Sequence, residues 1–130
     1  MSNIDLYKST DLANKIATTD LETLINPLTK EIYLFHTTVA GTTYIDDQSI
    51  FEALKVNDKL TLIREDNKYD KKAIMILTEN KKKIGYVPRE DNLIFSRLMD
   101  AGKLLIARVR SLDKKGDWNL VHINIFLIDF

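Results

Sequence analysis

The sequence predicts a mainly β fold: a small six-stranded antiparallel barrel with one internal helix, a short helical turn and a helical extension at the N-terminus. Three observations lead to this expectation. From residue 31 onwards, six short runs rich in β-branched and aromatic residues follow one another, most of them at hairpin distance. Only one later segment has the apolar spacing of an amphipathic helix. With 130 residues, 45% of them hydrophobic, the chain suffices for one core and not for two.

The first 30 residues differ in pattern from the rest of the chain. A helix can begin at Thr10 or Asp11, which are good N-capping residues, and its apolar spacing ends before Pro27. We therefore expect residues 1–30 to form an N-terminal helical extension and residues 31–130 to form the barrel domain. The helices of this extension could also dock a protein partner.

Six segments are expected to form the strands of the barrel. Each is short, apolar or alternating, and bounded by polar turns. The most regular is the fifth, in which Leu105, Ala107 and Val109 alternate with Arg108 and Arg110, so that one side is buried and the other is basic. The six ranges are 31–45, 60–63, 73–77, 84–88, 104–112 and 120–128.

Helix and turn signals separate these strands. Gly41 is expected to bend the first strand, and residues 48–55 are expected to form the short helical turn. The internal helix is expected over Leu93–Met99, because these residues place apolar side chains on one face and Gly102 follows as a C-terminal stop. Gly116 indicates a hairpin turn between the last two strands.

Charge is unevenly distributed, although the formal net charge of the chain is zero. Residues 64–115 contain 14 Lys or Arg against 8 Asp or Glu, whereas residues 1–63 contain 5 against 9. If the fold gathers these cations, they form an electropositive face suited to nucleic acid. The alternative is that they are ordinary solvated surface residues.

Several classes of protein are disfavoured by composition and motifs. The absence of cysteine excludes disulfides and cysteine-ligated zinc, and no apolar run is long enough to span a bilayer, so we expect a cytoplasmic protein. His36 and His122 lack the spacing of metal ligands, and Asp66 and Asp70 lack the register of a calcium loop. Because nucleophile elbows and phosphate-binding glycine loops are also missing, we expect no enzyme, no cofactor and no metal.

The most informative stretch is the hinge segment, residues 64–76, with the sequence REDNKYDKKAIMI. Together with its flanking motifs it closely resembles the HIRAN domain, a small barrel found alone in bacteria and phages and fused to helicase-like translocases in eukaryotes. The resemblance extends over about residues 34–109. Its motifs in chain order are Val39-Ala40-Gly41, Leu60 to Glu65, Asn67-Lys68-Tyr69-Asp70 with Ala73-Ile74, and Ile84 to Arg89.

This resemblance, which is to the stand-alone bacterial or phage type in particular, implies an OB-like or SH3-like barrel. In the eukaryotic members of the family such a barrel holds the free 3′ end of single-stranded DNA. By position, Asn67, Tyr69 and Asp70 would lie at the terminal nucleotide, with Tyr86 in the same groove. Arg89 would contact a backbone phosphate, and Trp118 would offer an aromatic face. The chain departs from the end-binding eukaryotic pattern where Thr37, Thr38 and Val39 replace an arginine and aromatic residues, and where Lys72 replaces an asparagine.

Two alternatives remain open on the sequence. Tyr69 could pack under the barrel rim while Asp70 caps a turn through its own backbone, and Trp118 could cover core at the hairpin. For the whole chain, the alternative to a DNA-end module is a protein-interaction or adaptor barrel that binds no nucleic acid.

Overall fold

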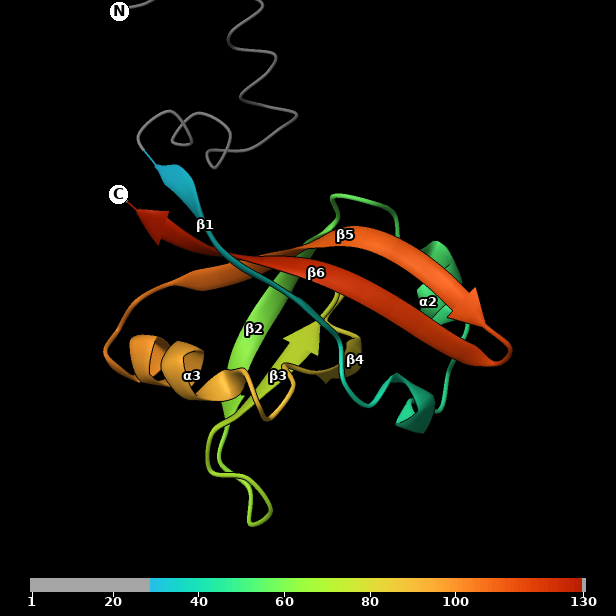
Figure 1. Cartoon of the computed structure of the whole chain (residues 1–130), viewed down its shortest axis with the longest axis horizontal. Coiled ribbons are helices and arrows are strands. Elements are labelled where there is room, and N and C mark those ends of the chain that lie inside the picture. The colour runs from blue at the N-terminus through green and yellow to red at the C-terminus, as the bar shows by residue number, and fades with distance from the viewer. Residues whose placement is uncertain (1–28, 130) are drawn as a thin grey trace, which may run out of the picture. The chain divides into compact units, whose positions relative to one another are not determined.

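Six strands form one sheet in the order β1-β6-β5-β2-β3-β4, as expected for the mainly β fold (Figure 1). The computed structural model describes residues 29–129, so the predicted N-terminal helical extension lies outside the described residues. In this order β6 pairs with β5, β5 with β2, β2 with β3 and β3 with β4, and all four pairs are antiparallel. The strands are β1 Lys30–Thr38, β2 Lys59–Glu65, β3 Ala73–Leu77, β4 Lys83–Tyr86, β5 Leu105–Lys115 and β6 Trp118–Asp129.

The two edge strands of the sheet meet, which curls it into a barrel. Just after β1, Ala40 and Tyr86 exchange two backbone hydrogen bonds, with N···O distances of 2.8 and 2.9 Å. The neighbouring Val39 N–H donates to the Val121 carbonyl of β6 at 2.9 Å. Figure 1 shows β1 running across β6 towards β4. The end of β1 therefore closes the barrel beside the last residue of β4.

Gly85 makes this closure possible. A Cβ atom built on Gly85 would lie 2.3 Å from the Ala40 carbonyl oxygen and 2.6 Å from Val39 Cγ1. Gly85 also has φ 151°, a backbone conformation that residues other than glycine rarely adopt. Only glycine lets β4 approach the end of β1 this closely.

Within residues 29–129, three short helices complete the fold. Helix α3 spans Asn92–Asp100 and confirms the predicted internal helix, and α2 spans Ile50–Ala53 within the predicted helical turn. The 3₁₀ helix η2 covers Thr42–Tyr44. In the described part of the chain, every helix is too short or too polar to cross a membrane.

The prediction of one long first strand over residues 31–45 is wrong at its end. Strand β1 stops at Thr38, and Gly41, with φ 80°, turns the chain into η2. Two interactions hold this turn: the bridge to β4 uses Ala40, and the Thr42 hydroxyl donates to the Asn119 carbonyl at 2.8 Å. The β-branched residues of this stretch favour a strand, but these tertiary contacts end the strand and hold the chain in a turn.

The core lies inside the barrel and is lined by alternate residues of the strands. On β5, Leu105, Ala107 and Val109 are buried and Arg110 is exposed, as the predicted alternation requires, but Ile106 on the opposite face is buried as well. The pairing of β5 with β6 shifts register between Val109 and Ser111, which marks a bulge at Arg110. The largest fully buried apolar side chains are Leu60, Ile74, Ile76, Ile84, Val87, Val109, Val121, Ile123 and Ile125.

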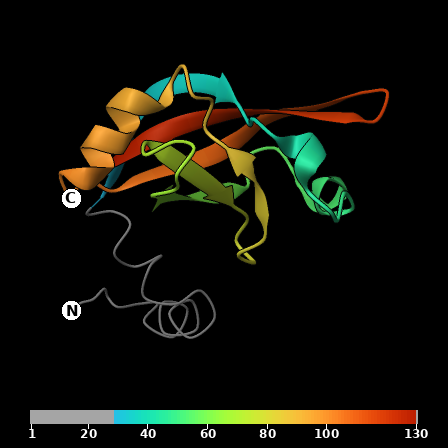
Figure 2. The ribbon, with the colours of Figure 1, turned by 90° about the horizontal axis from the view of Figure 1, so that it is seen from below.

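Helix α3 supports the hinge segment from both of its ends. Its first residue, Asn92, donates from Nδ2 to Asp70 Oδ2 at 2.9 Å. Its last residue, Asp100, accepts from Arg64 Nε at 2.9 Å and from Nη2 at 3.2 Å. Between them, Phe95 anchors the helix in the core. Figure 2 shows α3 lying along the sheet beside the β2–β3 connection that the hinge segment forms.

Candidate nucleic-acid interface

A pocket of about 360 Å³ opens where the hinge segment meets the end of β4. Five of the six predicted site residues line it, and the backbone that closes the barrel forms its floor. The lining residues are Ala40, Gly41, Asn67, Tyr69, Asp70, Ala73, Tyr86, Val87 and Arg89.

Asn67 organises the hinge segment around this pocket. Its Oδ1 accepts hydrogen bonds from the backbone N–H groups of Tyr69 at 2.9 Å and Asp70 at 2.8 Å. Its Nδ2 donates to Glu65 Oε2 at 2.7 Å. This is an Asx-type turn, in which the side-chain oxygen accepts backbone hydrogen bonds that a neighbouring strand would otherwise accept. Asn67 therefore positions Tyr69 and Asp70, and both the oxygen and the nitrogen of its side-chain amide are already hydrogen-bonded within the protein.

Tyr69 projects from this turn into solvent. The residue is 77% exposed, so the alternative in which Tyr69 packs under the barrel rim does not describe the structure. Lys68 Nζ lies 5.2 Å from the ring centroid, within the range of a cation–π contact. The Tyr69 carbonyl accepts a hydrogen bond from Arg89 Nη2 at 2.8 Å, which ties the two predicted residues together.

Asp70 combines a turn-capping role with a place in the pocket wall. Its Oδ1 accepts from the Lys72 backbone N–H at 2.9 Å, and its Oδ2 accepts from Asn92 and lies 3.7 Å from Arg89 Nε. The Lys72 hydrogen bond, followed by the Asn92 bond and the nearby cations, outweighs the effect of burial and lowers the pKa of Asp70. Asp70 is thus an ionised acceptor beside the cavity.

The hydroxyl of Tyr86 joins a polar network at the back of the pocket. It donates to the Glu65 carboxylate, with distances of 2.9 and 3.0 Å to the two oxygens, and accepts from Lys83 Nζ at 2.9 Å. Lys83 also lies 4.5 Å from the Tyr86 ring centroid. Hydrogen bonds from Asn67 and then from Tyr86 lower the pKa of Glu65. This network holds the Tyr86 ring in a fixed orientation.

Trp118 does not belong to this pocket. It is the first residue of β6, is paired with Lys115 at the tip of the β5–β6 hairpin, and is 44% exposed. If Trp118 offers an aromatic face to DNA, as predicted, it does so away from the pocket wall.

Thr37, one of the departures from the family pattern, is buried, and its hydroxyl donates a hydrogen bond to Asp91 Oδ2 at 2.7 Å.

The cations of residues 64–115 have diverse roles and do not act as one uniform block. Arg64 donates to the carbonyls of Ala73 and Lys71 as well as to Asp100, and Arg108 pairs with Glu31 at 2.7 Å. These two arginines are engaged in contacts that stabilise the fold. By contrast, the Arg89 side chain is 76% exposed and borders the pocket.

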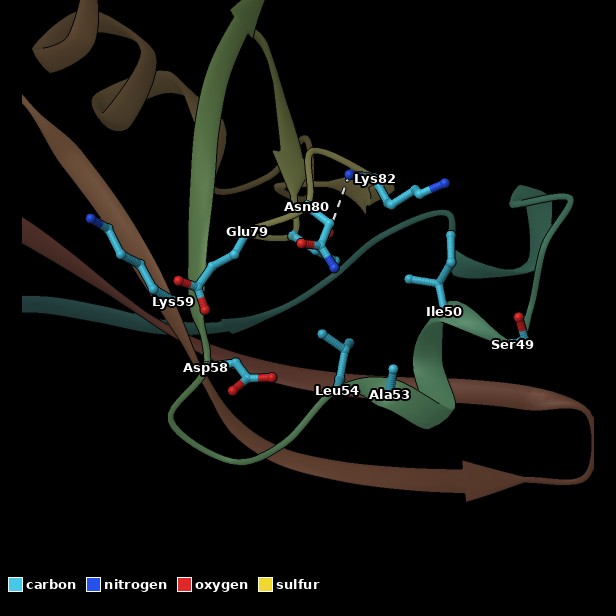
Figure 3. Close-up of a pocket in the computed structure, with 10 residues that line it drawn as sticks. Ser49, Ile50, Ala53, Leu54, Asp58, Lys59, Glu79, Asn80 and Lys82 are labelled. Carbon is cyan, nitrogen blue, oxygen red and sulfur yellow. Dashed lines mark hydrogen bonds between the residues drawn. The ribbon is translucent and has the colours of Figure 1, made fainter. Parts of the chain in front are cut away.

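The lysine run 81–83 divides between two sites. Lys83 contacts Tyr86 at the pocket described above, whereas Lys82 lines a second pocket of about 330 Å³ between α2 and the β3–β4 turn (Figure 3). Figure 3 shows Ile50 and Leu54 on one side of this second pocket and the polar side chains of Glu79 and Asn80 on the other. Its walls carry charges of both signs, with Asp58 among them, so it is not an electropositive site.

Sequence reasoning missed the residues that hold the pocket in place. Asn92 supports the hinge segment from a position outside every motif, and Arg64, although it lies in the Leu60 to Glu65 motif, was given no role. Ala40, Gly41 and Val87 supply apolar and backbone walls. The available signals were the two glycines, Gly41 and Gly85, whose positive φ angles mark a bend and a close approach of backbones.

Taken together, a curled six-stranded sheet with a rim pocket formed by a polar hinge defines a small β-barrel binding module. The chain belongs to the HIRAN domain family, whose model matches residues 32–127. HIRAN domains are known in general as DNA-binding domains. No curated protein sequence gives a significant match.

Two solved structures show the same fold. A protein from Lactobacillus plantarum is 30% identical, with a TM-score of 0.72, and the match covers 78% of this chain and 99% of that one. The HIRAN domain of human HLTF is 18% identical, with a TM-score of 0.62, and the match covers 78% of this chain and 79% of that one.

Proposed function

We propose that this chain is a single-stranded DNA-binding module that recognises free 3′ ends. The observation that carries the proposal is the position of Asp70, an ionised carboxylate in the wall of a pocket that also presents the Tyr69 ring and the Arg89 guanidinium. Membership of a DNA-binding family supports the choice of ligand class.

Asp70 supplies a physical reason for choosing an end over an internal site. A terminal 3′ hydroxyl can donate a hydrogen bond to a carboxylate oxygen, whereas a continuing strand places a phosphate at the same point. Two like charges about 4 Å apart repel by about 4 kcal/mol at an effective dielectric near 20. Arg89, whose Nε is 3.7 Å from Asp70 Oδ2, offsets part of this repulsion. The net free-energy preference for a 3′ hydroxyl over a continuing strand is therefore smaller than about 4 kcal/mol.

The remaining groups provide affinity without sequence preference. A base can stack on the exposed Tyr69 ring, and such contacts contribute about 1 to 3 kcal/mol per base. Arg89 and the nearby Lys68 and Lys83 supply attraction to the backbone phosphates, which is sensitive to salt. None of these contacts reads the edge of a base, so we expect binding to be independent of sequence.

The proposal is tested by fluorescence anisotropy with labelled oligonucleotides that differ only at the 3′ end. We expect a strand with a 3′ hydroxyl to bind at least about tenfold more tightly than the same strand with a 3′ phosphate, which corresponds to about 1.4 kcal/mol of the repulsion. Equal affinity for both ends would remove end recognition from the account. If no oligonucleotide binds even at low salt, the adaptor barrel becomes the better description.

A further inference from the structure

Two histidines and an arginine from three strands gather away from the pocket. His36 of β1 and His122 of β6 lie with Nε2 and Nδ1 3.1 Å apart, and their ring centroids are separated by 5.2 Å. Arg110 of β5 directly precedes Ser111, which pairs with His122 across the sheet, and the charge of Arg110 lowers the pKa of His36. We refer to these three residues as the histidine cluster; no role in the pocket accounts for it.

The histidine cluster lies on the same side of β1 as the pocket. Side chains of a strand alternate between its two faces, and Thr37 and Val39 are buried whereas His36 is exposed. His36 therefore shares a face with Ala40, which lines the pocket. Four residues of strand span about 13 Å at roughly 3.3 Å per residue. That distance corresponds to about four stacked nucleotides at roughly 3.4 Å each.

The bulge in β5 leaves Arg110 available for a ligand. Bulges redirect a side chain and loosen strand pairing locally, and the register shift between Val109 and Ser111 brackets Arg110. In the described part of the chain its hydrogen-bond partner is the neutral Asn124 Oδ1, at 3.4 Å, and it pairs with no carboxylate. Arg108, two residues earlier on the same strand, is instead neutralised by Glu31.

The charge of the histidine cluster favours an anion over a metal ion. A nitrogen separation of 3.1 Å would suit two metal ligands, but no third His, Cys, Asp or Glu joins them among the described residues. A divalent cation would also be repelled by Arg110. Partial loss of hydration around the ring lowers the pKa of His36, and repulsion from Arg110 and then from His122 lowers it further. A phosphate would relieve that repulsion.

We propose that the histidine cluster binds a backbone phosphate about four nucleotides from the 3′ end held in the pocket, and that this second contact strengthens as pH falls. The inference rests on the proposed function, because it places the same strand in both sites. Arg110 provides the permanent charge. The histidine pair takes up a proton when the phosphate is bound, since an adjacent anion favours the charged form of imidazole, while the ring nitrogen that stays neutral accepts the hydrogen bond between the two rings.

The test compares oligonucleotides of 3 and 10 nucleotides with identical 3′ hydroxyl ends. The longer strand should bind roughly tenfold more tightly at pH 6, as expected for a charge-assisted contact. This gain should shrink as pH rises from 6 to 8. Arg110→Gln and His122→Gln should remove most of the gain, while the affinity for the 3-nucleotide strand stays unchanged. Lys103→Gln, which removes an exposed cation elsewhere, should keep the gain.

A substitution that restores charge separates electrostatics from structure. His122→Lys should retain the length gain and make it less dependent on pH between 6 and 8, because only His36 is then left to take up a proton. If the gain survives in Arg110→Gln, or if its size does not depend on pH in the unmodified protein, the histidine cluster is not the second contact. Failure of the proposed function looks different: the 3-nucleotide strand would then bind equally with a 3′ hydroxyl or a 3′ phosphate, whatever the length gain.

Discussion

Asp70 shows how one side chain can serve both the turn and the candidate site. Its Oδ1 accepts from the Lys72 N–H, while Oδ2 faces Asn92 and Arg89 beside the pocket. Asp70 therefore caps the turn, as one interpretation of the sequence held, and its second oxygen still borders the pocket on which the proposed function depends. The turn fixes the carboxylate, and its fixed position is what would let it distinguish a hydroxyl from a phosphate.

The contribution of Asp70 to stability should depend on pH. Its pKa is lowered in the folded protein, so the stabilisation is complete above the unfolded value of about 3.9 and is lost as pH falls through the lower folded value. Asp70→Asn should lower the free energy of unfolding by roughly 1 to 2 kcal/mol at pH 7. Urea denaturation should show this difference shrinking as pH falls below about 3.9 and through the lower folded pKa of Asp70. The exposed Asp66→Asn serves as the control and should cost little at either pH.

Tyr69 is expected to contribute affinity and not stability. Because its side chain is 77% exposed, Tyr69→Ala should leave the melting temperature almost unchanged. Loss of a stacked base should weaken binding of single-stranded DNA by about 1 to 3 kcal/mol, or roughly fivefold to 150-fold. Tyr44, which is 87% exposed and lies outside the pocket wall, offers a matched control. Equal losses of affinity in Tyr69→Ala and Tyr44→Ala would argue against stacking in the pocket.

At the scale of elements, the pocket depends on where the barrel closes. Gly85 allows the backbone of β4 to pair with Ala40, and this pairing forms the pocket floor next to Tyr86. The hinge segment is then held against this floor by α3, through Asn92 at one end and Asp100 at the other. Closure and support thus come from different elements, and both are needed to shape the site.

Gly85→Ala should be more damaging than its backbone angle alone would explain. The added Cβ meets the Ala40 carbonyl at 2.3 Å, a backbone atom that cannot move aside without breaking the bridge. We expect a loss of about 3 kcal/mol or more in the free energy of unfolding. Gly116→Ala isolates the effect of a positive φ, because Gly116 has φ 62° and open space around it, and should cost about 1 to 2 kcal/mol. Similar losses in the two variants would contradict a steric requirement at Gly85.

The sequence could predict these elements wherever local pattern decides the structure. Alternation placed the inner face of β5, and apolar spacing with Gly102 placed α3 within a residue at each end. The end of β1 was predicted too late, because a bridge to β4 and a hydrogen bond to Asn119 determine it. Such contacts join residues more than 40 positions apart, and local propensity contains no information about them.

For the whole molecule, the same limit applies to charge. The basic composition of residues 64–115 is real, but Arg64 and Arg108 are bound to Asp100 and Glu31. Composition counts every cation equally, whereas the fold decides which remain accessible to a ligand. Arg89 at the pocket and Arg110 in the histidine cluster are the exposed arginines on which the two proposed contacts depend.

The proposed recognition of 3′ ends requires that Asp70 distinguishes a free 3′ hydroxyl from a continuing strand. Its most direct test is the ratio of the Kd for a 3′-phosphate oligonucleotide to the Kd for the 3′-hydroxyl strand, measured for the unmodified protein and for Asp70→Asn. We predict a ratio of about ten or more that falls towards one in the variant, chiefly because the 3′-phosphate strand binds more tightly once the negative charge is gone. A ratio that stays the same after the substitution would contradict it.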